Sequence, residues 1–185
     1  RDNYDMLYIF YRINKDKSKE YIVENFNNFG EKLNLKKYYF ENFDSDIEKF
    51  ESQTYENKEL ILLVEANDEQ FNLMMEKVKN KQNISLNRAL NNEILGSLFN
   101  KGVEISKGDY IAKFDDDDIY GSNYLSDSIM PFAYSSASIV GKLESFMFHQ
   151  GTNKTYLRFE NKQHRYQNYV LGPTIIAKRE VFDKV

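Results

Sequence analysis

Four consecutive aspartates, Asp115 to Asp118, are the residues of this sequence with the clearest capacity for chemistry. Four adjacent carboxylates repel one another and Asp is a poor strand former, so the run is costly unless solvent or a cation neutralises it. A hard divalent cation such as Mg²⁺ or Mn²⁺, bound through one or two carboxylates and through phosphate oxygens, would neutralise it. A solvated acidic loop is the alternative, and the run alone does not decide between the two.

A short strand is expected to position this run, from Asp109 to Phe114, with Gly121 following the carboxylates. The alternation of side chains places Tyr110, Ala112 and Phe114 on one face and the two residues between them on the other. The carboxylates would then project from the end of a strand.

Strand and helix patterns alternate along the chain, which predicts an α/β fold. The near-continuous apolar run at 58–64 suits a parallel strand that is covered on both faces. The polar loop from Glu65 to Asp68 follows this strand, at the edge where ligands collect in open α/β sheets. We further expect strands at 4–13, at 35–40 and around Ile84, and helices from Ser18 to Gly30, from Asp46 to Gln53 with Ile47 and Phe50 inward, and from Phe71 to Val78.

Composition narrows the class of protein. The length of 185 residues predicts a single domain, 1–185. A net charge of -4 gives no bulk attraction to nucleic acid or to anionic membranes, and no apolar stretch approaches the roughly 20 residues that span a bilayer. The absence of Cys is compatible with a reducing cytoplasm. With no Cys and two His, any metal is expected to be held by oxygen.

Four segments carry a resemblance to a known family. They are the Q-x-Y-x-N-x-E pattern that begins at Gln53, the stretch 95–111 with Asn100, the acidic run with the residues after it, and the stretch 172–182. In this order they resemble family 2 glycosyltransferases with the GT-A, nucleotide-diphosphosugar transferase fold. The residues around the acidic run look closest to bacterial members that build surface or capsular glycans.

The resemblance implies a GT-A-type mixed, mainly parallel sheet flanked by helices. It implies an enzyme of polysaccharide biosynthesis that transfers a sugar from a nucleotide-diphosphosugar, most simply a UDP-sugar, to a hydroxyl of a glycan acceptor with inversion. Mn²⁺ or Mg²⁺ would stabilise the charge that develops on the leaving diphosphate. A nucleic-acid partner and a membrane span are not expected.

The same resemblance assigns roles within the acidic run, which sits where this family carries its DxD-type motif. Asp117 would ligate the metal directly, and Asp115 is the second metal candidate. Asp115 and Asp116 would otherwise meet the ribose hydroxyls or hold the metal through water, and Asp118 would face the acceptor.

Other donor-binding candidates lie elsewhere in the sequence. Asn100 would support the donor pocket, although an ordinary polar helix residue is an equal alternative. Gly172 would let the backbone approach the donor sugar, with a turn glycine as its alternative. Asn67 and Asp68 are candidates for reading the base by their position alone.

Two features depart from the family pattern. The resemblance begins near residue 53, no first strand with a Thr/Ser-rich nucleotide loop is recognisable, and residues 1–35 are expected to be an added subdomain or a remnant of one. The catalytic general base of inverting members follows the stretch 172–182, so we expect it beyond Val185. The catalytic residue is therefore unknown in this sequence, which by itself would transfer weakly or not at all.

Three other functions remain open. A calcium-binding loop would use Asp116, Asp118, Gly121 and Asp127, but a strand pattern rather than a helix precedes it. A nucleotidyltransferase would need a Gly-rich phosphate loop near the N-terminus, where only Gly30 occurs. A non-catalytic or degenerate nucleotide-sugar-binding domain is compatible with the missing base.

Overall fold

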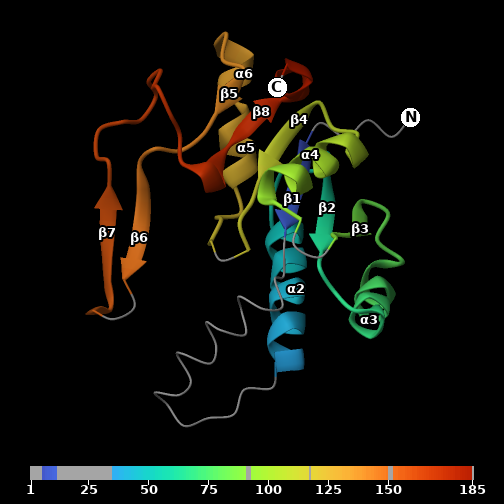
Figure 1. The fold of residues 1–185 in the computed structure, drawn as a ribbon. Coiled ribbons are helices and arrows are strands. Elements are labelled where there is room, and N and C mark those ends of the chain that lie inside the picture. The colour runs from blue at the N-terminus through green and yellow to red at the C-terminus, as the bar shows by residue number, and fades with distance from the viewer. Residues whose placement is uncertain (1–5, 12–34, 91–92, 117, 150–151, 185) are drawn as a thin grey trace.

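A six-stranded sheet forms the centre of the computed structural model, which describes residues 6–11, 35–90, 93–116, 118–149 and 152–184 (Figure 1). The strands lie in the order β3-β2-β1-β4-β8-β5. Their bounds are β1 (Met6–Tyr11), β2 (Lys58–Val64), β3 (Ile84–Arg88), β4 (Tyr110–Lys113), β5 (Ile139–Val140) and β8 (Ile176–Lys178).

The sheet is mixed and mainly parallel. Strand β1 pairs in parallel with both β2 and β4, and β2 pairs in parallel with β3. Strand β8 is antiparallel to β4 and to β5. Every residue of β2 is buried, which confirms the strand at 58–64 that its apolar run predicted. The predicted α/β class is therefore confirmed.

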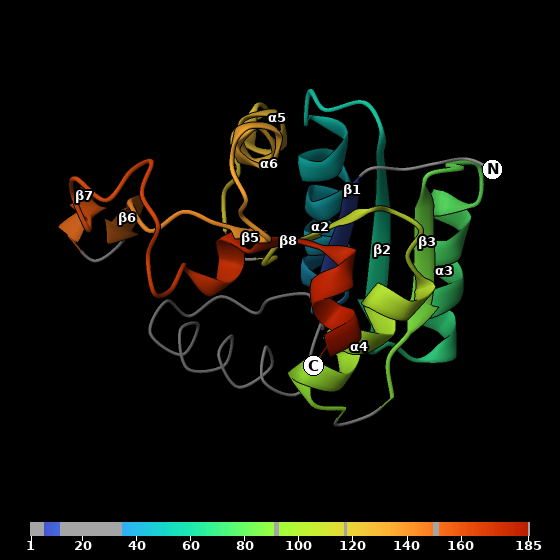
Figure 2. The ribbon, with the colours of Figure 1, turned by 90° about the horizontal axis from the view of Figure 1, so that it is seen from above.

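Helices cover both faces of this sheet (Figure 2). On one face, α2 (Leu35–Glu51), α3 (Asp68–Val78) and α5 (Tyr124–Ile129) pack on one apolar cluster, in which Phe43 and Phe50 of α2 contact the side of the sheet that contains Phe114. On the other face, Leu98 of α4 (Leu95–Ile105) packs on a second cluster with Ile111 of β4. The 3-10 helix η3 (Arg179–Lys184) joins this second face.

One prediction of secondary structure is wrong. The stretch 35–40 was expected to be a strand, but it is the first part of α2, which runs without a break to Glu51. Neither glycine nor proline interrupts 35–51, and the apolar residues Phe43, Ile47 and Phe50 recur at helical spacing and are buried. Packing of this stripe on the sheet extends the helix through the aromatic stretch that precedes it.

The N-terminal strand lies at the centre of the sheet. The strand predicted at 4–13 is observed as β1, which pairs with β2 on one side and β4 on the other. The helix predicted from Ser18 to Gly30 lies outside the described residues, so the organisation of residues 1–35 as a whole stays a prediction. The strand at Ile84 and the helix at 71–78 are confirmed as β3 and α3.

A second, smaller sheet stands apart from the first. Strands β6 (Ser145–His149) and β7 (Lys154–Arg158) form an antiparallel pair that extends away from the main sheet in both views (Figures 1 and 2). The short helix α6 (Pro131–Tyr134) follows α5, and η2 (Gly172–Thr174) leads into β8. Across the described ranges, no helix has both the length and the apolarity to cross a membrane.

Candidate functional site

The acidic run lies at the end of β4, between a parallel neighbour, β1, and an antiparallel neighbour, β8. The carboxyl ends of parallel strands and the points where strand direction changes are where α/β sheets bind ligands. Phe114 is fully buried and anchors the start of the run. Asp115 and Asp116 are half-buried and Asp118 is exposed, whereas Asp117 lies outside the described residues.

Tyr120 joins the acidic run to η2. Its hydroxyl accepts a hydrogen bond from the backbone N–H of Asp115 at 3.0 Å and donates one to the carbonyl of Pro173 at 2.8 Å. Its ring packs on Phe114 with 4.0 Å between ring centroids. Burial raises the pKa of Tyr120 far above its usual value, so the phenol stays protonated and remains a donor. The carboxylates and the Gly172 segment are thereby brought together.

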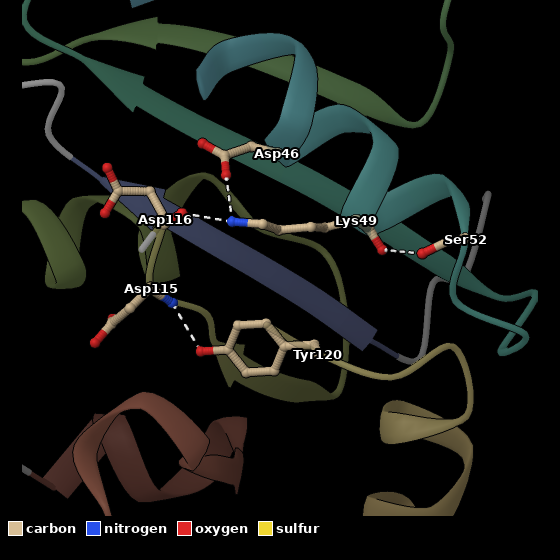
Figure 3. Close-up of polar contacts among 6 residues, drawn as sticks. All are labelled: Asp46, Lys49, Ser52, Asp115, Asp116 and Tyr120. Carbon is tan, nitrogen blue, oxygen red and sulfur yellow. Dashed lines mark hydrogen bonds and ion pairs between the residues drawn. The ribbon is translucent and has the colours of Figure 1, made fainter. Parts of the chain in front are cut away.

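A lysine and a buried carboxyl from α2 hold the other side of the run (Figure 3). Lys49 donates from Nζ to the backbone carbonyl of Asp116 and lies 3.3 Å from Oδ1 of Asp46. Asp46 is only 4% exposed. Burial, and secondarily the charge of Asp116, raises the pKa of Asp46 to about 7, while Lys49 opposes the shift. The acidic run thus rests on a polar contact with the helix beneath it.

The charges around the run suit a hard cation. Lys113 pairs with the carboxylate of Asp115, so this carboxylate of the run is already in contact with a cationic group. Carboxylate oxygens are the ligands that Mg²⁺ and Mn²⁺ prefer, and the donor chemistry of the run therefore fits the expected metal. Within the part of the chain that the structure describes, no group of three or more His, Cys, Asp or Glu side chains could hold a metal ion by itself.

Gln53 and Thr54 clamp the segment that follows the acidic run. The Gln53 side chain is 3% exposed; it donates to the carbonyl of Gly121 at 2.8 Å and accepts from the N–H of Leu125 at 3.1 Å. The N–H of Thr54 donates to the carbonyl of Ser122 at 2.8 Å. The first residues of the Q-x-Y-x-N-x-E pattern therefore fix the path of the chain between the carboxylates and α5.

The glutamate of the same pattern fixes the other end of β4. The buried Glu59 carboxylate accepts from the backbone N–H groups of Lys107 and Gly108 at 2.6 and 3.0 Å. From the stretch 172–182, Arg179 donates to the carbonyls of Gly108 and Val103 at 2.8 and 2.9 Å. Both charged residues act on the framework of the site, because they hold the strand that ends in the acidic run.

The remaining donor-binding candidates lie on other elements of the fold than the acidic run. Gly172 begins η2, and a Cβ atom built on it would meet no other atom within 4 Å, so the space beside it is open. Asn67 caps α3 by accepting from the N–H of Gln70 at 2.9 Å. Asp68 lies 2.8 Å from the guanidinium of Arg88. Asn67 and Asp68 share the carboxyl edge of the sheet with the acidic run, two strands along.

Asn100 lies on the exposed side of α4. It lines an open depression with Glu93, Ser97, Lys101 and Glu104. This depression is formed by residues of α4 and the segment before it, and the acidic run contributes nothing to it. The structure thus gathers Asp115, Asp116 and the Gly172 segment, and leaves Asn100 on a separate surface.

Sequence reasoning missed Asp46 and Lys49. The signal was present, because Asp46 falls between Phe43 and Phe50 on the same helical stripe, where a carboxylate is costly unless it has a partner. The strand predicted at 35–40 conceals this signal, because it makes Asp46 the first residue of a short helix. A helix that begins at Leu35 places Asp46 in the fourth turn, on its buried face.

Comparisons with known proteins agree with this architecture. The family model described as Glycosyl transferase family 2 matches residues 12–179. Crystal structures of S. aureus TarS 1-349, alone, with UDP and with UDP-GlcNAc, superpose with TM-scores of 0.57, 0.60 and 0.58 over 97% of this chain, at 15–16% identity. A Haloferax volcanii protein named glucosyl-dolichyl phosphate glucuronosyltransferase is 31% identical over 78 residues, 42% of this chain.

These relatives are longer than the chain. It covers 47–48% of the TarS structures and 25% of the Haloferax protein. The structural likeness confirms the GT-A-type fold that the resemblance implied.

Proposed function

Because this chain belongs to glycosyl transferase family 2, we propose that it binds a UDP-sugar with Mn²⁺ or Mg²⁺ at the acidic run. The proposed reaction is an inverting transfer to a glycan hydroxyl, as part of the synthesis of a bacterial surface polysaccharide in the cytoplasm. Asp117 and Asp115 are the proposed metal ligands, and Asp116 and Gly172 line the donor site.

One observation carries this proposal: the Tyr120 hydroxyl spans from the N–H of Asp115 to the carbonyl of Pro173. It sets the acidic run beside η2, where Gly172 leaves open space for a ligand. Carboxylates and a backbone without a side chain are the two features that a diphosphate-bound metal and a close-packed sugar need. The order of these segments along the chain is also that of the family.

The residues that contact the acidic run would contribute to the binding and the orientation of the donor. A bound divalent ion would offset the charge that grows on the leaving diphosphate. Lys49 and Tyr120 hold the backbone on either side of the run, so its carboxylates need little reorganisation when the donor binds. Lys113 pairs with Asp115 and balances its charge.

The similar TarS structures support a uridine donor. TarS 1-349 was crystallised with UDP and with UDP-GlcNAc, and the Haloferax relative is named as a glucuronosyltransferase that acts on glucosyl-dolichyl phosphate. The sugars in these names differ. We therefore propose UDP as the nucleotide part of the donor and test that part first.

Calorimetric titration of UDP into the chain with Mn²⁺, and again with EDTA, tests the proposal. We expect binding in the micromolar range, on the order of -8 kcal/mol, that EDTA abolishes. Asp117→Asn should remove this binding without unfolding the domain. Absence of UDP binding by the folded wild-type chain in the presence of Mn²⁺ would refute the proposal.

The matched control is Asp127→Asn, which removes the same charge from an exposed residue in the first turn of α5. UDP binding should be unchanged in this variant. A calcium-binding loop would use Asp127 and would not need UDP. Loss of Ca²⁺ binding in both variants, with no UDP binding in the wild type, would replace the proposal with a calcium module.

A further inference from the structure

The arm, which we define as residues 145–170, has a surface that the donor site does not explain. Its strands β6 and β7 extend away from the main sheet and its helices (Figures 1 and 2). All five residues of β7, and the last four of β6, are exposed. An isolated two-stranded hairpin is marginally stable in water, so this arrangement favours a partner that covers it.

One face of the hairpin is apolar. The register pairs Phe146 with Leu157 and Phe148 with Thr155, so these four side chains share a face. Phe146 is 77% exposed and Phe148 is 57% exposed. Phenyl and isobutyl groups side by side on an extended ribbon form the kind of contiguous apolar surface that marks an interaction site.

The opposite face carries the positive charges of the hairpin. Lys154 pairs with His149 and Arg158 pairs with Ser145, on the same side as Met147. Over the whole arm the sequence has four Lys or Arg and one Glu, a net charge of +3, whereas the chain as a whole has -4. The arm is thus an apolar and cationic element on an otherwise acidic protein.

This combination selects the chemistry of the partner. Phe, Leu and Met side chains offer no hydrogen-bonding edge to a sugar and suit hydrocarbon. Lys and Arg can extend their stems along an apolar surface while the charged head reaches a phosphate. An apolar face and an opposite face that carries Lys and Arg are typical of elements that lie in the plane of an anionic bilayer.

The base of the arm adjoins the candidate site. The N–H of Lys142 donates to Oγ1 of Thr174 at 2.8 Å, and the N–H of Leu171 donates to the carbonyl of Lys142 at 3.1 Å. Thr174 ends η2, the 3-10 helix that Tyr120 joins to the acidic run. Docking of the arm would therefore hold the site next to the surface on which the arm lies.

We propose that the arm docks this domain onto an anionic lipid bilayer, with Phe146 and Phe148 in the interface and Lys154 and Arg158 at the phosphates. This docking is independent of the donor proposal, since it involves none of the carboxylates. It requires no membrane-spanning helix. The electrostatic attraction to the bilayer comes from the arm alone, so the negative net charge of the whole chain does not reveal it.

Sedimentation with vesicles tests this docking. Phosphatidylcholine vesicles that contain phosphatidylglycerol should bind the chain, binding should weaken with salt, and phosphatidylcholine alone should bind little. Lys154→Ser with Arg158→Ser should weaken binding roughly thirtyfold, because each cation near an anionic surface contributes about a factor of five. Phe146→Ser with Phe148→Ser should weaken it at least about tenfold.

The control is Leu90→Ser with Ile94→Ser, which removes two comparably exposed apolar side chains near α4. This variant should bind vesicles as the wild type does. Equal loss in both apolar variants, or failure of the wild type to bind anionic vesicles, would overturn the proposal. A concentration-dependent dimer that only the Phe146 and Phe148 changes abolish would replace the bilayer with a second copy of the chain.

A fluorescence measurement locates the contact directly, because the chain has no Trp. Phe148→Trp provides a single reporter in the arm, and Ile94→Trp provides one on the exposed surface near α4. The emission of the first should shift to the blue on addition of anionic vesicles, and that of the second should not. An unchanged spectrum for the arm reporter, with the protein bound to vesicles, would contradict docking through this face.

Discussion

The acidic run and the arm are both rich in polar residues and lie outside the core, but they differ in their contacts with the rest of the domain. Around the run, the side chains of Lys49 and Tyr120 hold the backbone in place, and the Tyr120 hydroxyl also donates to the backbone carbonyl of Pro173. In the arm, large apolar side chains are left in solvent. Contacts within the domain fix the geometry of the run, whereas the exposed apolar face of the arm favours a binding partner.

This difference indicates that the contacts around the run contribute to the stability of the domain, whereas the surface of the arm contributes to association with a partner. Buried polar contacts such as that of Gln53 are costly to break, because the loss leaves unpaired groups in the interior. Exposed arm contacts are replaceable by water. We expect substitutions of the buried side chains that hold the run to lower the free energy of unfolding, and substitutions in the arm to change it little.

The largest expected effect is on the pH dependence of stability, through Asp46. Its pKa of about 7 in the folded state lies above the ordinary 3.8, so folding retains a proton that the unfolded chain releases. This contribution is present below about pH 4 and is lost as the pH rises through 7, which lowers the free energy of unfolding by up to about 4 kcal/mol. Asp46→Asn should remove this decline and be more stable than the wild type above pH 7.

Urea unfolding from about pH 4 to about pH 8 measures this effect. The control is Asp44→Asn, a half-buried residue of the same helix that pairs with Lys77. Its stability curve should keep the wild-type slope. A slope that persists in Asp46→Asn, or disappears in both variants, would show that the Asp46 carboxyl is not the source.

The second effect compares two glutamines. Gln53→Ala removes a buried amide and leaves the carbonyl of Gly121 and the N–H of Leu125 without their partner, so the free energy of unfolding should fall by about 2–3 kcal/mol. Gln163→Ala in the arm removes an exposed contact with Glu144 and should cost under about 0.5 kcal/mol. If chemical denaturation shows equal losses in the free energy of unfolding for the two variants, the proposed difference between the two regions is contradicted.

The smallest effect tests the bridge from the run to η2. Tyr120→Phe keeps the ring on Phe114 but removes the hydroxyl, and should lower the free energy of unfolding by about 1–2 kcal/mol. UDP affinity should weaken with it, because Asp115 loses one fixed backbone contact. Tyr166→Phe, which alters an exposed tyrosine of the arm, should change neither. A Tyr120→Phe variant with both properties unchanged would mean that the bridge has no positioning role.

Sequence patterns predicted the fold where local and global preferences agree. The apolar run at 58–64 and the alternation at 109–114 gave β2 and β4 because both are buried in the sheet. The stretch 35–40 failed because aromatic residues favour strands locally, while the packing of Phe43 and Phe50 extends a helix through it. Such a preference is overridden by contacts far along the chain, which a single sequence does not reveal.

The candidate site, like the fold, could be predicted from the sequence only in part. The acidic run was recognisable because four carboxylates in sequence need neutralising. The contacts that hold it were not, since Lys49 and Asp116 are 67 residues apart and Tyr120 and Pro173 are 53 apart. The roles of Asp115, Asp116, Gly172 and the other candidates stay predictions, and Asp117 lies outside the described residues.

The most direct test of the central claim, that the acidic run binds a metal and a nucleotide together, is their thermodynamic linkage. UDP would be titrated calorimetrically at a series of Mn²⁺ concentrations, and Mn²⁺ at a series of UDP concentrations. Each ligand should raise the affinity for the other by the same factor, after correction for the binding of Mn²⁺ to UDP in solution. A UDP affinity that is independent of Mn²⁺ would contradict the claim.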